Sequence, residues 1–292
     1  MKGDFIGFIY NGAHSSDMGI VRVSDGSRYN EDLLPTYQDK SLAIPGGDGA
    51  YFFGSNYTQK VIPIQIAFDH LTELQYRKLR QWLGDNKIHE LIFDERPYKK
   101  YKVKVNGQPN LKTICFDEDN QRIYKGEGTI NFIAYFPFAI NVFKFLTDEI
   151  ISEYDNINEW LDSSGIVEQG DYDTFDITNK HYELYNPGDL ETDFKLKFNF
   201  NENGKIAKTN ISFNTENQFN FNEITKIGND YGVQVNTENN LIEGIDKNGK
   251  ITGYIYNNYK ESGVFFKIPL GKSTLSVIGA TPASIEYNYL YF

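Results

Sequence analysis

The sequence predicts a mainly β protein of two domains. Tyr and Phe dominate its large apolar residues, with 21 Tyr and 22 Phe against 2 Trp and 2 Met, and these aromatic side chains favour the pleated surface of a sheet. Short apolar runs recur between turn sequences such as Asn203-Gly204 and Asn248-Gly249, which is typical of strands joined by tight turns. The length of 292 residues exceeds that of one typical domain.

Charge marks the expected domain boundary. Residues 1–146 carry 18 Lys and Arg against 17 Asp and Glu, whereas residues 147–292 carry 11 against 23, so the second half holds the acidic excess of a chain whose net charge is −11. A near-neutral segment can pack against further copies of itself, while a strongly acidic one repels its copies and suits solvent. We therefore expect a self-associating domain over residues 1–145 and a solvent-facing domain over residues 146–292.

The first domain is expected to open with short strands and a long irregular segment. Strands are predicted over residues 5–10 and 18–23, separated by the turn Asn11-Gly12. The segment that follows has the run Ile44-Pro45-Gly46-Gly47-Asp48-Gly49 at its centre, which suits the tip of a projecting hairpin. Residues 61–68 then alternate in hydropathy and predict a core strand that buries Ile62, Ile64, Ile66 and Phe68 on one face.

One amphipathic helix follows this strand. Thr72 is a favourable N-cap, and Gln75 completes a capping box three residues later. Gly84 is placed to end the helix. Its apolar face is formed by Tyr76, Leu79, Trp82 and Leu83. Further strands are predicted over residues 90–93, 98–105, 113–116 and 129–136.

The second domain is expected to begin with a short helix over residues 148–161. Apolar side chains have helical spacing there, at Ile150, Tyr154, Ile157 and Leu161. Beyond this segment, short runs rich in Phe, Tyr and Ile alternate with turn sequences. Their spacing predicts an all-β sandwich or jelly roll.

The residue types of catalytic and metal sites are present without the required spacing. The run His14-Ser15-Ser16-Asp17 contains the members of a hydrolytic triad, but triad members come from separate segments, so a turn capped by Ser or Asp is the better interpretation. His70, His89 and His181 lack the spacing of a zinc site. Nothing distinguishes a glycosidase pair among the 23 carboxylates of the second half. We expect no catalytic residue, no metal ion and no cofactor.

Composition also argues against nucleic-acid and membrane partners. An acidic chain is poorly suited to neutralise the phosphates of a duplex. The longest apolar run, residues 132–140, contains Pro137 and is far shorter than a bilayer span. The alternating series Lys100, Lys102 and Lys104 is interpreted as the solvated face of a strand. The single cysteine, Cys115, lies in a predicted apolar strand, where inert packing is expected.

Several motifs follow one another in a recognisable order. The first half contains Phe8-Ile9-Tyr10-Asn11-Gly12, the run from His14 to Ile20, the Gly-rich run at 44–49, the strand at 62–68, the helix end Leu79 to Leu83 and Leu91-Ile92-Phe93-Asp94. The second half contains Asn186-Pro187-Gly188-Asp189 and Phe265-Phe266-Lys267-Ile268-Pro269-Leu270-Gly271. This ordered set resembles the distal tail proteins of long non-contractile-tailed phages, and the resemblance covers most of the chain.

The resemblance implies a specific architecture. The N-terminal domain would be a tail-tube-like β-sandwich with one helix and a projecting hairpin, and the C-terminal domain a galectin-like β-sandwich. Six copies would close into a ring through the N-terminal domain, with residues 45–57 as a contact arm. The candidate interface residues are Ile44, Pro45, Gly46, Tyr51, Phe52, Phe53 and Tyr57.

The resemblance also implies a place and a set of partners. The ring would form the distal end of the virion tail of a phage or prophage, after assembly in the cytoplasm of the host bacterium. It would join the tail tube protein to the tail-associated lysin or fibre, and in some phages carry receptor-binding proteins. DNA would pass through the ring without being read, and no membrane would be entered.

Two other functions compete with this structural role. The β-rich second half also suits a carbohydrate-binding adhesion module that acts on the bacterial surface. A glycan hydrolase is the less favoured alternative, because no catalytic pair is distinguished in the sequence.

Overall fold

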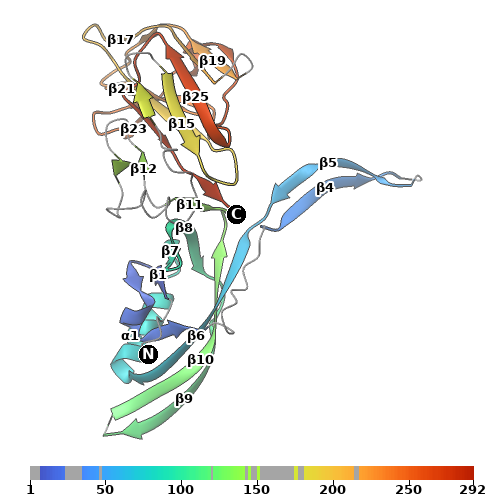
Figure 1. The fold of residues 1–292 in the computed structure, drawn as a ribbon, viewed down its shortest axis with the longest axis vertical. Coiled ribbons are helices and arrows are strands. Elements are labelled where there is room, and N and C mark those ends of the chain that lie inside the picture. The colour runs from blue at the N-terminus through green and yellow to red at the C-terminus, as the bar shows by residue number, and fades with distance from the viewer. Residues whose placement is uncertain are drawn as a thin grey trace. The chain divides into compact units, whose positions relative to one another are not determined.

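The computed structural model describes residues 7–23, 35–45, 48–119, 121–141, 144–145, 150–151, 174–176, 181–213 and 217–292. Within these residues the chain is mainly β, with one α-helix and two short 3-10 helices (Figure 1). The prediction of a mainly β protein with one main helix is confirmed. The chain divides into two compact units: unit 1 is Met1–Ile140 together with Phe292, and unit 2 is Asn141–Tyr291.

Unit 1 is built on a curled sheet with the strand order β2-β1-β7-β8-β10-β6-β3, in which β9 also pairs with β10 and β11 with β8. Its elements are β1 (Phe8–Tyr10), β2 (Ala13–His14), η1 (Ser15–Met18), β3 (Ile20–Arg22), β4 (Tyr37–Ala43), β5 (Ala50–Tyr57), β6 (Lys60–Thr72), α1 (Glu73–Leu83), β7 (His89–Phe93), β8 (Arg96–Val105), β9 (Asn110–Glu118), β10 (Gln121–Ala134) and β11 (Ala139–Asn141). Strands β4 and β5 form a separate two-stranded sheet, and β5 leads directly into β6 (Figure 1).

Helix α1 begins at the predicted capping box. The Thr72 hydroxyl accepts from the Gln75 backbone N–H at 3.4 Å, and the Gln75 side chain accepts from the Thr72 backbone N–H at 2.9 Å. Gly84 follows the helix with a right-handed backbone, so it ends α1 without a left-handed turn. These reciprocal bonds satisfy backbone donors that the first helical turn leaves free.

Aromatic rings join the helix to the sheet in the core of unit 1. The ring centroid of Tyr10 on β1 lies 5.5 Å from that of Trp82 on α1 and 4.8 Å from that of Phe132 on β10. The Trp82 indole N–H donates to the Tyr10 carbonyl at 2.7 Å. This bond satisfies the polar atom of a buried indole and fixes α1 against the strand.

Unit 2 contains a six-stranded sheet, β14-β15-β25-β18-β19-β24, and a five-stranded sheet, β23-β22-β21-β16-β26. Its elements are β12 (Lys144–Phe145), β13 (Ile150–Ile151), β14 (Thr174–Asp176), β15 (His181–Asn186), β16 (Phe194–Asn199), β17 (Lys205–Ile206), β18 (Thr209–Ser212), β19 (Gln218–Phe221), β20 (Ile224–Thr225), β21 (Gly232–Asn236), β22 (Leu241–Ile245), β23 (Ile251–Ile255), η2 (Asn257–Tyr259), β24 (Lys260–Gly263), β25 (Gly271–Ile278), β26 (Ser284–Tyr287) and β27 (Leu290–Tyr291). The rings of Phe198 on β16 and Phe221 on β19 lie 5.6 Å apart in the core, so the two sheets face each other as a sandwich.

The predicted helix over residues 148–161 is wrong where the structure describes it. Residues Ile150–Ile151 form β13, which pairs with Lys144–Phe145. Two adjacent β-branched residues suit an extended backbone, and the pairing satisfies their polar groups. The remaining residues of that prediction lie outside the described ranges.

Candidate assembly surface

The hairpin of β4 and β5, here called the arm, presents the candidate interface residues. The two strands pair from Tyr37 and Tyr57 at the base to Ala43 and Ala50 near the tip. The register shifts between Asp39 and Ser41, where β5 carries one extra residue. Gly54 lies at this bulge with a φ of 108°, a backbone that glycine adopts without a Cβ clash.

The arm exposes its large apolar side chains. The exposed fraction is 60% for Leu42, 61% for Tyr51 and 66% for both Phe52 and Phe53. An isolated two-stranded hairpin is marginally stable in water and gains stability when a further surface covers it. A cluster of exposed apolar residues on such a hairpin therefore indicates an interaction surface.

Aromatic rings anchor the arm at its base. Tyr57 lies 5.0 Å from Phe138 between ring centroids, and Phe138 lies 6.1 Å from Phe292 and 5.4 Å from Phe136. Tyr37 meets Tyr57 edge-on at 6.4 Å. This base cluster of five rings holds the first strand pair of the arm in place.

The predicted arm residues occupy different parts of the hairpin. Tyr51, Phe52, Phe53 and Tyr57 lie on β5. Beyond β4, Ile44 is half-buried and its N–H donates to the Gly49 carbonyl at 3.3 Å, while Pro45 is exposed. Gly46 lies outside the described residues.

Strand β4 also contributes large side chains to the arm, and these residues were not predicted. Leu42 faces Tyr51 across the hairpin, and Tyr37 faces Tyr57. Extending an antiparallel register outward from the Gly-rich turn would have revealed both pairs. The role of these residues as an interface stays a prediction.

A second exposed surface lies on β9. Within the described residues this nine-residue strand pairs only with β10, in a register without a bulge from Asn110 to Glu118. Ile114 is 67% exposed and Phe116 is exposed beside it. The expectation that Cys115 is packed is wrong, because this cysteine is exposed on the same strand. A regular, exposed edge strand is a template for pairing with another chain.

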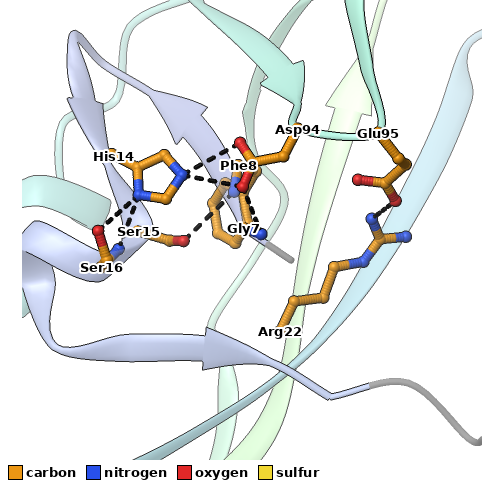
Figure 2. A network of polar contacts seen from close by, with 8 residues as sticks. All are labelled: Gly7, Phe8, His14, Ser15, Ser16, Arg22, Asp94 and Glu95. Carbon is orange, nitrogen blue, oxygen red and sulfur yellow. Dashed lines mark hydrogen bonds and ion pairs between the residues drawn. The ribbon is translucent and has the colours of Figure 1, made fainter. Parts of the chain in front are cut away.

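Polar contacts gather around His14, as Figure 2 shows. Its Nδ1 lies 2.6 Å from the Ser16 hydroxyl oxygen and its Nε2 lies 3.1 Å from the Asp94 carboxylate. The Ser16 backbone N–H also donates to Nδ1, so the imidazole caps η1. Asp94 accepts from the Gly7 N–H at 2.6 Å, and a Cβ on Gly7 would lie only 2.6 Å from the imidazole.

This network holds segments together without a hydrolytic arrangement. The carboxylate that reaches His14 comes from Asp94, not from Asp17. Both Nδ1 contacts come from Ser16, a residue two positions along the same turn, which is the geometry of a local cap. An ion pair between Arg22 and Glu95 ties β3 to the same β7–β8 turn (Figure 2). Residues 14–17 therefore form a capped turn, as predicted, but the prediction that Ser or Asp is the cap is wrong, because the His14 imidazole takes that place.

Other candidate residues have structural contacts. His89 pairs with Asp85 at 3.1 Å and His70 with Glu118 at 2.6 Å, whereas nothing is described of the His181 side chain. Lys100 on β8 pairs with Glu90 at 2.8 Å, but its side chain is only 15% exposed. Lys102 is exposed and Lys104 is half-buried, so the prediction of a solvated strand face holds only for Lys102.

Metal and membrane features are not found in the described part of the chain. It holds no group of three or more His, Cys, Asp or Glu side chains that could bind a metal ion. None of its helices has the length and apolar character needed to cross a membrane.

Comparisons with known proteins connect this fold to phage tails. Residues 16–134 match the family Sipho_tail, described as a phage tail protein RIFT-related domain. The crystal structure of the SPP1 Dit (gp 19.1) protein, described as a paradigm of the hub adsorption apparatus in phages that infect Gram-positive bacteria, matches with 11% identity and a TM-score of 0.61. That match covers 98% of this chain and 99% of the SPP1 protein.

Further similarities are weaker. The phage P2 baseplate in its activated conformation with Ca matches at 8% identity over 98% of each chain, with a TM-score of 0.45. The baseplate with Sr matches at 9% identity over 97% of each chain, with a TM-score of 0.46. A comparison with curated proteins finds no match. Residues 16–134 therefore match a phage tail protein RIFT-related domain, and the chain shares the fold of the SPP1 Dit protein, in agreement with the resemblance of its sequence motifs.

Proposed function

We propose that the chain is the structural distal tail protein of a long non-contractile-tailed phage or prophage, and that six copies close into a ring through residues 1–145. The exposed arm carries this proposal, because it lies within the segment that matches the phage tail domain and displays apolar residues that an isolated monomer leaves in water. The ring joins the tail tube protein to the tail-associated lysin or fibre at the distal end of the virion tail. It has no enzymatic activity.

The charge distribution supports self-association through the N-terminal domain. Residues 1–146 are nearly neutral by count, so identical copies approach without strong repulsion. Residues 146–292 form the galectin-like C-terminal domain in this proposal and stay outside the ring. A closed ring requires two different complementary patches on each copy. The arm supplies one patch, and the edge of β9 that has no further partner among the described residues supplies the other.

One buried polar cluster of unit 2 gives no support to the carbohydrate-binding alternative. Asn236 and Gln234 donate to Glu243 at 3.1 and 3.4 Å on the five-stranded sheet. All three side chains are buried. They bind one another and do not present free groups to a sugar.

The proposal is tested by the mass of the purified chain in solution. Light scattering after size-exclusion chromatography should give six chain masses for the wild type. A variant with Leu42→Ser, Tyr51→Ser and Phe53→Ser should give one, because it removes the apolar surface of the arm. The matched control Ile251→Ser with Ile255→Ser changes residues of similar exposure on β23 of unit 2 and should remain hexameric.

Two results would count against the ring. A wild-type chain that stays monomeric at every concentration tested contradicts self-association. Equal masses for the arm variant and the wild type show that assembly does not use the arm. Circular dichroism of each variant confirms that the chain is folded before the masses are compared.

A further inference from the structure

Positive charge is concentrated around helix α1, away from the arm. Residues 77–104 contain nine Lys and Arg against four Asp and Glu, a net charge of +5 in a chain whose total is −11. The helix and the loop that follows it present four of these cations to solvent: Arg77, Lys78, Arg80 and Lys87. A surface that carries one sign of charge attracts partners of the opposite sign.

The carboxylates of the same segment do not neutralise these cations. Each of the four is engaged elsewhere, in the pairs Asp85–His89, Glu90–Lys100, Asp94–His14 and Glu95–Arg22. Among the described residues, no carboxylate lies within ion-pair distance of Arg77, Lys78, Arg80 or Lys87. The positive charge of α1 is therefore directed to solvent.

The outer face of α1 combines cations with an apolar side chain. Leu74 is 64% exposed, and Arg77 and Lys78 follow it by three and four positions, so all three share one face. The buried residues of the helix are Leu79, Trp82 and Leu83. Arg80 lies in the last turn, where a cation complements the helix dipole. Arg77 and Lys78 lie before that turn, so the dipole does not explain them.

We propose that the basic face, defined as Leu74, Arg77, Lys78, Arg80 and Lys87, binds a carboxylate-rich surface of a different tail protein. This inference rests on the proposed function and adds which element receives a neighbour and what chemistry that neighbour presents. The exposed leucine favours a protein, because protein interfaces combine apolar contacts with arginine. Phosphate polymers are bound through cations and polar groups and gain little from such a side chain.

A second copy of this chain fits the basic face poorly. Further carboxylates of unit 1 are also engaged, in the pairs Asp69–Lys125, Asp117–Arg122 and Glu118–His70. Residues 147–292 are strongly acidic, but they stay outside the ring in the proposed function. A different protein with unpaired Asp and Glu is therefore the occupant that the charges favour.

Chemical modification of purified phage tails tests this occupant. Acetylation of Lys78 and Lys87 should be slower in tails than in the purified chain by about tenfold or more, as expected for groups that react only after local opening. Lys247, exposed in the β22–β23 turn, should react equally in both. A carbodiimide joins an amine directly to a carboxylate, so it should link Lys78 or Lys87 to Asp or Glu of another tail protein.

The outcomes separate this inference from the proposed function. Tails that lack the chain refute the proposed function, and this inference with it. Tails that contain the chain, with Lys78 and Lys87 as reactive as in the purified chain, overturn the basic face alone. Carbodiimide links only to Asp and Glu of the same sequence assign the face to another copy and overturn it. Protection without any link indicates a partner without carboxylates, which also overturns it.

Charge reversal gives a second measurement. Arg77→Glu with Lys78→Glu should lower incorporation of the chain into tails by about tenfold or more, because like charges would then face each other. The mass of the purified ring should not change. The control Lys247→Glu with Lys250→Glu reverses two exposed charges of unit 2 and should be incorporated normally. Normal incorporation of the folded α1 variant, checked by circular dichroism, would contradict the proposal.

Discussion

Replacing Tyr256 by Phe removes one oxygen from the core of unit 2 and should be unusually costly. Tyr256 is fully buried. Its hydroxyl donates to Asp230 Oδ2 at 2.7 Å and accepts from the Ile227 backbone N–H at 2.9 Å. Asp230 is 1% exposed, and its Oδ1 has no hydrogen-bond partner. The substitution therefore leaves a buried carboxyl group without its side-chain donor and a backbone N–H without its acceptor.

The magnitude follows from these contacts. A hydrogen bond to a charged group contributes about 1.5–3 kcal/mol, and a neutral one about 1 kcal/mol. A buried carboxylate that loses its hydrogen-bond donor adds to the loss of stability. We therefore expect the free energy of unfolding of unit 2 to fall by about 3–5 kcal/mol. Native domains are stable by only about 5–15 kcal/mol, so the change should be easy to measure.

Urea unfolding followed by circular dichroism measures the loss, and hydrogen exchange with mass spectrometry assigns it to unit 2. Tyr259→Phe is the matched control, because this neighbouring tyrosine is partly exposed, and its variant should lose less than about 0.5 kcal/mol. In the double variant Asp230→Ala with Tyr256→Phe, the losses should be less than additive, because no carboxyl group remains to be stranded. A loss below about 1 kcal/mol in Tyr256→Phe alone, against the ~1.5–3 kcal/mol of a bond to a charged group, would refute the reasoning.

The remaining predictions concern pH and two local contacts. Burial and the bond to Asp230 raise the pKa of the Tyr256 hydroxyl well above its usual value of 10.0. The unfolded chain therefore releases this proton at a lower pH than the folded chain, so the free energy of unfolding should hold below pH 10 and fall as the pH rises above it. Urea titrations at several pH values should show a less steep fall in Tyr256→Phe. Asp94→Ala removes the partner of His14 and of the Gly7 N–H and should destabilise unit 1 by about 1–2 kcal/mol in thermal unfolding, with Asp17→Ala unchanged as control. Thr72→Ala removes the helix cap and should cost about 1 kcal/mol, whereas Thr72→Ser should retain most of it.

Sequence alone predicts the parts of this fold that depend on neighbouring residues. The capping box needs only Thr72 and Gln75, three positions apart, and both of its bonds are present. The turn at Gly249 follows the same rule, because Asp246 Oδ1 accepts from nearby backbone N–H groups and the glycine adopts a φ of 76°. Such features are set by local geometry and do not depend on contacts with distant segments.

Contacts between distant segments could not be predicted in the same way. Asp94 lies 80 residues from His14, and no spacing rule connects them. Tyr256 and Asp230 are 26 residues apart and meet only because the sandwich brings their loops together. Cys115 was expected to be buried because its neighbours Ile114 and Phe116 are apolar. The pattern identified a strand but not whether a further layer covers it, and β9 is left exposed.

Whether a further layer covers an apolar strand is also the question that the arm raises. The apolar residues 50–53 lie on β5 of the arm, and the structure leaves them in water. A long exposed apolar hairpin is a liability for a chain that works alone, because it invites unspecific pairing. It becomes useful when copies of the chain cover it, and the acidic residues 147–292 would keep free chains soluble until that happens. In the proposed ring, the nearly neutral residues 1–146 therefore form the contacts between copies. Repulsion between the acidic residues 147–292 restricts these contacts to the arms.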